Sequence, residues 1–306
     1  MISAYHESAK RTGAIIIPEC GLDSAPADIV TFMLASHIRK TLHAPTLSVY
    51  YTLHGLKTGF SGGTSATALN IFSQYPMKKL AEVMKPYALS PVRPTDRAKP
   101  PPTSLLHRLC GLVDIPELGG VQTVGLMAVV DACIVHRSWG LFESQAKATS
   151  RPELSWGSRF NFREYMRANG VIHGWLFGLG LGLASLLLAF PLTRWILTPL
   201  VTKFMIPAPG EGPSKEKQKG DFLSYRALAI ADTQKKEKVR ARLDVAYGAY
   251  PTTALTMTAA ADVILRGDLK ATEAGRLGGG ILTPATLGEQ YLEKLRAFGM
   301  KIEIEE

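Results

Sequence analysis

The residues best suited to chemistry lie where a short apolar run gives way to a predicted helix. Residues 14–17 (AIII) are apolar and mostly β-branched, which is typical of a strand buried on both faces of a parallel sheet. A turn follows, and then a helix over about residues 26–40. In open α/β sheets ligands bind beyond the carboxyl ends of the strands, and a helix start offers free N–H groups and partial positive charge. Asp23, Ser24 and Asp28 are therefore the candidate catalytic residues.

The chemistry that this helix start could support is the stabilisation of a phosphate, a carboxylate or a developing enolate oxygen. The alternative is structural: Asp23 or Ser24 caps the helix, Pro26 occupies its first turn, and Gly21 permits a tight turn. Both interpretations can hold at once. Cys20 could act as a nucleophile only if its thiolate were stabilised, and a small residue packed at a strand end is the commoner case.

Two other predicted helix starts carry small and hydroxyl-bearing residues. The sequence SGGT at 61–64 precedes an apolar-periodic helix expected over 65–84, and glycines let a ligand approach the backbone. Thr283 and Pro284 follow a glycine run and precede the last predicted helix, 285–298. Each start could equally be an N-cap, formed by Thr64 and by Thr283. The predicted substrate-binding residues are Cys20, Gly21, Ser61, Gly62, Gly63, Thr64 and Thr283.

Composition narrows the classes of function. The net charge of +9 favours an acidic partner, such as a phosphate-bearing cofactor, an acidic carrier domain or a membrane surface. The basic residues are scattered and no zinc-finger spacing occurs, so nucleic acid is not a predicted partner. The histidines show no metal-ligand spacing, and no metal is predicted. Three cysteines at wide spacing indicate reduced thiols in a cytosolic protein.

The remaining pattern predicts the elements that would frame these sites. Proline-rich, charged residues at 86–104 indicate a surface linker. The other predicted elements are a half-buried strand at 46–54, a helix at 124–142, a strand at 159–165, a hairpin joining 222–232 to 238–247, and a helix at 252–265.

Residues 168–193 contain no Asp, Glu, Lys or Arg and form the most apolar stretch of the chain. With the residues up to 206 they make a hydrophobic segment, with Trp175 and Trp195 near its ends. The stretch is long enough to span a bilayer, but its glycines and Pro191 weaken a helix. Three alternatives stay open: a membrane span, a monotopic hairpin on a membrane, or a hydrophobic wall over the substrate cleft.

Five segments resemble motifs of one family, in the family's order and from end to end of the chain. They are Cys20 to Asp28 (CGLDSAPAD), Ser61 to Leu69 (SGGTSATAL), Ile134 to Ser138 (IVHRS), Pro207 to Ser214 (PAPGEGPS) and the stretch GGGILTP from Gly278. Any one alone is weak, but five in order are specific. The chain resembles the saccharopine dehydrogenase-like oxidoreductases, including the trans-acting enoyl reductases that serve polyketide synthases.

The resemblance implies an α/β plus α+β fold. The family's N-terminal Rossmann domain opens with a glycine-rich turn that places pyrophosphate on a helix N-terminus, and no such turn occurs here. We therefore expect residues 1–40 to be the C-terminal remnant of a Rossmann-type dinucleotide-binding domain. Residues 41–306 would form an α+β substrate and dimerisation domain with the linker 86–104 and the hydrophobic segment 168–206. The chain would then be N-terminally truncated, in the gene model or in nature.

The function that the resemblance implies is reduction of the enoyl thioester double bond of a polyketide or fatty-acyl chain with NADPH. The implied partner is a polyketide synthase or acyl carrier domain; a membrane surface and a homodimer are left open. The expected location is the cytoplasm, with membrane association left open. One alternative is a truncated, non-catalytic, membrane-associated remnant. Another is a related reductase of amino-acid metabolism, whose carboxylate-rich substrate would want an arginine cluster that the sequence does not show.

The missing glycine-rich turn gives the first prediction. Without a phosphate-cradling turn, the 306-residue chain should bind NADPH weakly or not at all. Titration by fluorescence or calorimetry measures this directly. A dissociation constant near micromolar would mean that the chain carries a nucleotide site of another kind.

Overall fold

The structure is a computed structural model that describes residues 1–59, 62–96, 100–101, 103–204, 212, 214, 216 and 218–305. Two sheets carry the strands. The larger has seven strands in the order β3-β4-β5-β2-β6-β7-β9, and the smaller pairs β1 with β8. The strands are β1 Ile15–Ile16, β2 Thr46–Lys57, β3 Val113–Ile115, β4 Gly120–Val124, β5 Asn161–Arg167, β6 Phe222–Ala231, β7 Lys238–Val245, β8 Gly280–Ile281 and β9 Lys301–Glu305.

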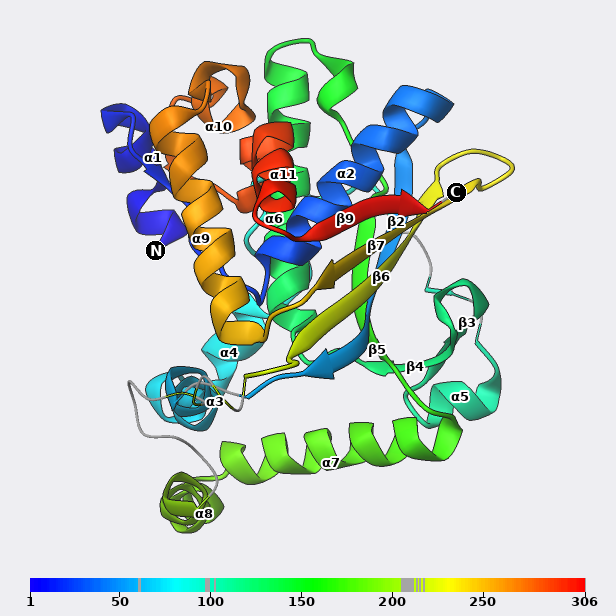
Figure 1. Ribbon diagram of the computed structural model, residues 1–306, viewed down its shortest axis with the longest axis vertical. Helices are drawn as coiled ribbons and strands as arrows, with labels where there is room; N and C mark the ends of the chain where they lie inside the picture. The colour runs from blue at the N-terminus through cyan, green and yellow to red at the C-terminus, as the bar shows by residue number, and fades with distance from the viewer. Residues whose placement is uncertain are drawn as a thin grey trace.

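Helices cover mainly one face of the larger sheet (Figure 1). Its central pair, β2 and β5, is parallel, and the other neighbours are antiparallel. The chain therefore has a mixed α/β architecture, as predicted. The helices are α1 Ile2–Thr12, α2 Ala25–Leu42, α3 Gly62–Gln74, α4 Met77–Val83, α5 Leu105–Leu109, α6 Ala128–Ala148, α7 Val171–Ala189, α8 Pro191–Phe204, α9 Ala249–Arg266, α10 Glu273–Arg276 and α11 Gly288–Ala297, with short 3-10 turns that include η1 Pro116–Leu118 and η4 Pro284–Leu287.

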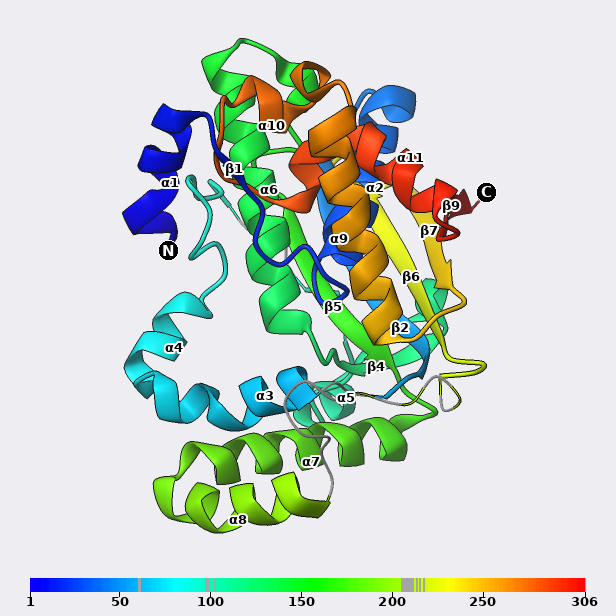
Figure 2. The ribbon, with the colours of Figure 1, turned by 60° about the vertical axis from the view of Figure 1, so that its left-hand side comes forward.

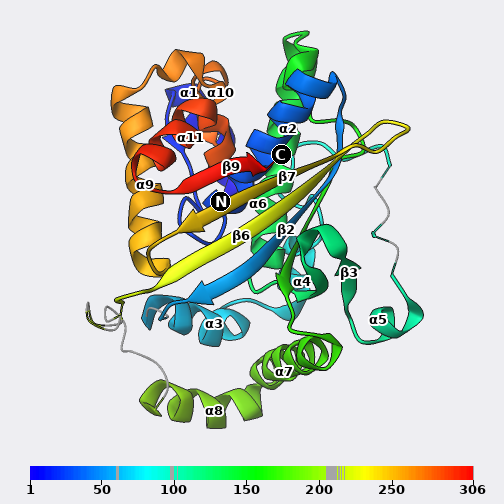
Figure 3. The same ribbon diagram turned by 45° about the vertical axis from the view of Figure 1, so that its right-hand side comes forward.

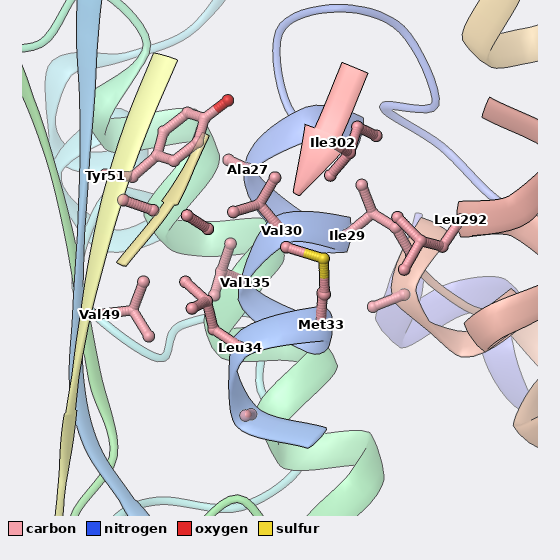
Figure 4. Close-up of a cluster of buried hydrophobic side chains, with 14 of the residues drawn as sticks. Ala27, Ile29, Val30, Met33, Leu34, Val49, Tyr51, Val135, Leu292 and Ile302 are labelled. Carbon is pink, nitrogen blue, oxygen red and sulfur yellow. The ribbon is translucent and has the colours of Figure 1, made fainter. Parts of the chain in front are cut away.

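The hydrophobic core lies between the larger sheet and the helix layer. Figure 4 shows α2 at its centre: Val30 and Leu34 face Val49 on β2, while Ile29 faces Leu292 on α11. A helix buried on both sides in this way must be apolar around most of its circumference. This explains why α2 shows little amphipathic contrast in its sequence.

The N-terminal segment attaches to the body through the small parallel sheet. Helix α1 ends at Gly13, whose φ of 72° is left-handed and whose N–H bonds the carbonyls of Ala9 and Lys10. Strand β1 then pairs in parallel with β8, Ile15 opposite Gly280. The predicted burial on both faces is wrong, because Ile16 is 38% exposed. Whether residues 1–40 derive from a Rossmann-type domain remains a prediction.

Several predicted elements differ in extent. The predicted helix 65–84 is two helices, α3 and α4, separated at Pro76, which lacks the N–H that a continuous helix needs. The predicted helix 124–142 begins later, since residues 120–124 form strand β4. Strand β2 is longer than predicted and buried on both faces over most of its length, because β3 and η1 cover part of its second face. The hairpin of β6 and β7 is confirmed.

The segment after α4 packs tightly against α6. Tyr87 is buried and its hydroxyl donates to the carbonyl of Phe160 at 2.6 Å. A Cβ built on Gly140 of α6 would lie 2.0 Å from Ser90 Oγ and 2.8 Å from Pro91 Cδ. Glycine at 140 is therefore required by this crossing.

Helices α7 and α8 lie at one end of the molecule, apart from the main helix layer (Figures 1 and 2). Among the described residues, α7 is the one helix long and apolar enough to cross a membrane, with a mean hydropathy of 1.9. Only 6% of it is buried in the structure. A core helix of a soluble protein would be mostly buried, so α7 is not such a helix.

The crossing at Gly140 gives a paired prediction. Gly140→Ala should lower the free energy of unfolding by about 1–3 kcal/mol, because the methyl group overpacks against Ser90 and Pro91. Gly180→Ala on α7 is the matched control, since a Cβ there meets nothing within 4 Å. Better helix propensity should make it neutral or stabilising by up to about 1 kcal/mol. Denaturant unfolding compares the two, and equal effects would contradict the packing argument.

Candidate functional site

A cavity of about 230 Å³ lies where β2 ends and three helices begin. The starts of α2, α6 and α9 converge on it, so their partial positive charges point toward the same space. Its wall is mostly apolar, with acidic groups at one side. The lining residues are Glu19, Gly21, Leu22, Asp23, Leu53, Leu56, Thr58, Gly59, Leu126, Met127, Glu164, Tyr225, Ala249, Tyr250 and Thr253.

Two buried carboxyl groups form an acid pair on the cavity wall. Glu164 lies on β5 and Asp131 lies in the first turn of α6, and their carboxyl groups hydrogen-bond to each other. Ser24 Oγ donates to Asp131 Oδ1 at 3.1 Å, and the Met127 N–H donates to Glu164 Oε1 at 3.4 Å. Glu164 Oε2 is buried and has no hydrogen-bond partner among the described residues. Glu164 is also one of the lining residues, so the acid pair borders the space that a bound molecule would occupy.

Burial keeps this pair from ionising fully. Loss of solvent raises the pKa of Glu164 to about 7, against the opposing effect of the hydrogen bonds from Asp131 and the Met127 N–H. Burial, reinforced by the neighbouring Glu164 charge, raises the pKa of Asp131 well above its usual range. The pair therefore holds at least one shared proton at neutral pH. A carboxyl group that is protonated near the working pH can serve as a general acid.

Two stacked aromatic rings lie beside the acid pair, on the side of the sheet. Tyr51 and Tyr225 stack with ring centroids 4.8 Å apart, and Tyr51 lies opposite Glu164 in the β2–β5 register. Burial raises the pKa of both hydroxyl groups. They therefore stay neutral and lower the local dielectric around the carboxyl groups. Tyr225 also lines the cavity, so it is more than the sheet-face packing that the hairpin alone would suggest.

A second buried cluster lies on the other side of the α2 start. The Asp28 carboxylate accepts hydrogen bonds from Ser138 Oγ at 2.5 Å and from the Ala285 N–H at 2.8 Å. The Ser138 hydroxyl also lies 2.7 Å from Thr283 Oγ1. Burial raises the pKa of Asp28 to about 7, against these hydrogen bonds. The cluster joins α2, α6 and η4, so its residues hold the helices that carry the cavity wall.

The three candidate catalytic residues therefore have different surroundings. Asp23 lines the cavity, and burial raises its pKa. Ser24 precedes α2 but its side chain bonds Asp131 and makes no cap hydrogen bond. Asp28 points into the second cluster. Of the three, only Asp23 lines the cavity. Ser24 and Asp28 instead hydrogen-bond to side chains of α6.

The predicted substrate-binding residues are similarly divided. Gly21 lines the cavity, and a Cβ on it would lie 3.0 Å from Thr253 Cγ2, so close packing against α9 and not a tight turn accounts for this glycine. Cys20 Sγ lies 3.9 Å from Tyr291 Oη, and burial raises its thiol pKa to about 11, which keeps it protonated and a poor nucleophile. Thr283 belongs to the Asp28 cluster.

Of the remaining predicted residues, three belong to α3. Ser61 is outside the described residues. Helix α3 begins at Gly62 and includes Gly63 and Thr64, so the prediction of Thr64 as the cap before a helix at 65 is wrong. The helix starts three residues early because glycine at 62 and 63 does not prevent helical backbone.

The acid pair itself was not among the predicted residues. One signal was present in the sequence: alternation along strand 159–165 places Glu164 on the same face as Phe160 and Phe162, both buried. A carboxylate on the buried face of a strand needs a partner or a function. Asp131 gave no comparable signal, because its pairing with Glu164 is set by the packing of α6 on β5.

The NADPH that the resemblance implies does not fit this cavity. Among the described lining residues none is Lys or Arg, and three are acidic. These residues therefore offer no side-chain cation to pair with a pyrophosphate. The glycine run at 278–280 has a structural explanation that involves no cofactor. A Cβ on Gly279 would lie 2.8 Å from the Ala14 carbonyl oxygen, so the close approach of β1 requires glycine there. We therefore assign no described residue to the cofactor.

Known proteins resemble the chain over nearly its whole length. It is 29% identical over 309 residues to a Mycobacterium tuberculosis protein provisionally named a trans-acting enoyl reductase. The aligned region covers 99% of this chain and 70% of that protein. Trans-acting enoyl reductases of Mycobacterium bovis and Mycobacterium leprae are 28% and 26% identical, each over 98% of this chain. No family model matches the chain. The similarity supports the enoyl reductase branch of the predicted resemblance, while the wider family and the truncation remain predictions.

The Asp28 cluster gives a prediction about pH. Because the folded pKa of about 7 exceeds the unfolded value of about 3.9, the folded state binds the extra proton between these limits. Asp28 should therefore contribute stability below about pH 4 that is lost as the pH rises through 7. Asp28→Asn can keep one acceptor for the Ala285 N–H, so the variant should fold and lose this part of the pH dependence.

Denaturant unfolding across this pH range measures the difference in slope between parent and variant. The exposed Asp114→Asn is the matched control and should follow the parent. Asp28→Ala, which leaves the Ser138 and Ala285 donors without an acceptor, should cost about 2–5 kcal/mol. An Asn variant whose pH slope equals that of the parent would contradict the role given to the Asp28 carboxyl.

Proposed function

We propose that the chain is the substrate-binding part of an oxidoreductase that reduces the double bond of an enoyl thioester. The observation that carries the proposal is the hydrogen-bonded acid pair at the side of an apolar cavity, with Glu164 among the residues that line it. The similarity to trans-acting enoyl reductases supports the reaction class. The proposed reductant is NADPH, by resemblance alone.

The reaction adds a hydride to the β-carbon of the acyl chain and a proton to the α-carbon. The residues described here would supply the proton. In the proposed binding mode the acyl chain lies against Leu53, Leu56 and Leu126, with its α-carbon beside the Glu164 carboxyl group. Glu164 gives its proton to the α-carbon, and the shared hydrogen bond lets Asp131 replace that proton.

The start of α2 suits the oxygen of the thioester. Charge that develops on this oxygen during reduction is favoured by the partial positive charge of a helix N-terminus. A protonated Glu164 adds no repulsion, because it carries no charge in that state. The rise in the pKa of Asp23 that burial causes works in the same direction.

The proposed partner is an acyl carrier domain or a polyketide synthase that delivers the thioester. The net charge of +9 favours an acidic carrier. The proposed location is the cytoplasm. A non-catalytic remnant remains the alternative, and the experiment below separates the two.

Proton transfer at the α-carbon can be tested without the reductant. In D₂O, the chain should catalyse exchange of the α-hydrogen of a saturated acyl-pantetheine thioester, since removal of that proton reverses the proposed donation. Glu164→Gln should slow the exchange by about 10²–10⁴-fold, because the amide cannot accept or return the proton. Mass spectrometry of the thioester follows the deuterium.

Glu293→Gln, an exposed carboxyl change on α11, is the matched control and should exchange at the parent rate. Thermal melts check that both variants fold. If the folded parent binds the thioester but catalyses no exchange, the proton role of Glu164 is excluded. If it does not bind the thioester either, the non-catalytic alternative is favoured.

A further inference from the structure

Helices α7 and α8 both expose many large apolar side chains. On α7 the exposed large side chains recur at alternating intervals of four and three residues, which places them in one stripe. The neighbouring helix α8 adds the exposed residues Leu192, Trp195, Ile196 and Leu200. The stripe on α7, with the following residue Phe190, consists of Ile172, Leu176, Leu179, Leu183, Leu186 and Phe190, each 53% exposed or more.

The opposite side of α7 faces the protein. Thr123 Oγ1 donates to the Gly174 carbonyl at 3.0 Å, and a Cβ on Gly174 would lie 2.9 Å from Leu112 Cδ2. At about 100° per residue, the stripe lies roughly 120–200° around the helix from Gly174. The side with Gly174 and the half-buried Phe177 and Leu181 thus packs toward β4, and the exposed stripe points outward.

The helix therefore lies along the body and does not project from it. Figures 2 and 3 show α7 running past the end of the sheet with α8 beside it, and α3 packs against both. To span a bilayer, α7 would have to leave Thr123 and α3. Helix α8, of 14 residues, would reach only about 21 Å across a hydrocarbon core of about 30 Å.

The charges around this surface suit an anionic lipid headgroup layer. Residues 165–210 contain no Asp or Glu but include Arg167 and Arg194. Trp175 and Trp195 are 42% and 76% exposed, and tryptophan is enriched where apolar and polar membrane layers meet. The neighbouring helix α5 adds Arg108 and three exposed leucines.

We propose that α7 and α8 insert side-on into one leaflet of an anionic lipid bilayer and hold the protein at its surface. The leucine stripe enters the acyl region, the tryptophans lie at the headgroup boundary, and the basic residues contact the lipid phosphates. This binding does not depend on the proposed reaction. Of the earlier alternatives, it corresponds to the monotopic hairpin, and no residue of α7 or α8 is among those that line the described cavity.

Flotation of the 306-residue chain with lipid vesicles tests the proposal. The chain should float with phosphatidylcholine vesicles that contain phosphatidylglycerol, and less with phosphatidylcholine alone. Leu183→Glu and Trp195→Glu should each weaken partitioning about ten- to a hundredfold, since each removes one buried apolar side chain. Leu265→Glu is the matched control: its side chain is 80% exposed on α9, at the far end from α7, and it should float as the parent does.

Depth is measured with a single tryptophan at the middle of α7, using Leu183→Trp in a Trp175→Phe, Trp195→Phe background. Trp139 and Trp156 are buried in the core and stay out of reach of the lipid. Lipids brominated near the headgroup should quench position 183 more than lipids brominated at the chain ends. Stronger quenching from the bilayer centre would indicate a span and overturn the proposal.

Two other results would also overturn it. If Leu183→Glu floats as well as the parent, the stripe does not contact lipid. If the parent does not float but forms a dimer that Leu183→Glu dissociates, the occupant of the surface is a second copy of the chain. Light scattering of both proteins distinguishes this case.

Discussion

The hydrogen bonds of the buried Asp28 carboxylate hold together the parts of the chain on which the site depends. Ser138 on α6 and the Ala285 N–H at η4 both donate to it, and Thr283 adjoins Ser138. Nearby, Arg137 donates to the carbonyls of Leu89 and Ile281. Three segments far apart in the sequence thus meet at one point. Polar groups buried here must stay paired, because an unpaired donor or charge in the core is costly.

The hydrogen bonds of Asp28 also fix the geometry of the cavity, because both lie at the start of α2. The first turn of α2 carries Asp28 inward, and just before the helix Asp23 lines the cavity while Ser24 bonds Asp131. A small rotation of α2 would separate Ser24 from Asp131 and change the pairing of the two carboxyl groups. The Asp28 cluster and the acid pair are therefore coupled through the same helix start, because Asp28 and Ser24 are four residues apart.

Much of the framework could be predicted from the sequence, because local signals determined it. Gly13 ended α1 where its left-handed backbone was needed, and the TQKKE turn lay between the strands of the predicted hairpin. Other features depended on contacts between distant residues. The acid pair needs α6 packed on β5, and Gly140 needs the crossing at Ser90. Strand β9 was not predicted, and it is the pairing of residues 301–305 with β7 that makes this short segment a strand.

That last strand also protects the sheet from self-association. Strand β9 alternates charged and apolar residues, and Glu303 and Glu305 form ion pairs with arginines on β7 and β6. The opposite edge is β3, which is only three residues long. Charged or very short edge strands are poor templates for another chain to extend. At high concentration the folded protein should therefore resist the edge-to-edge growth that leads to fibrils, even though its helices expose so much apolar surface.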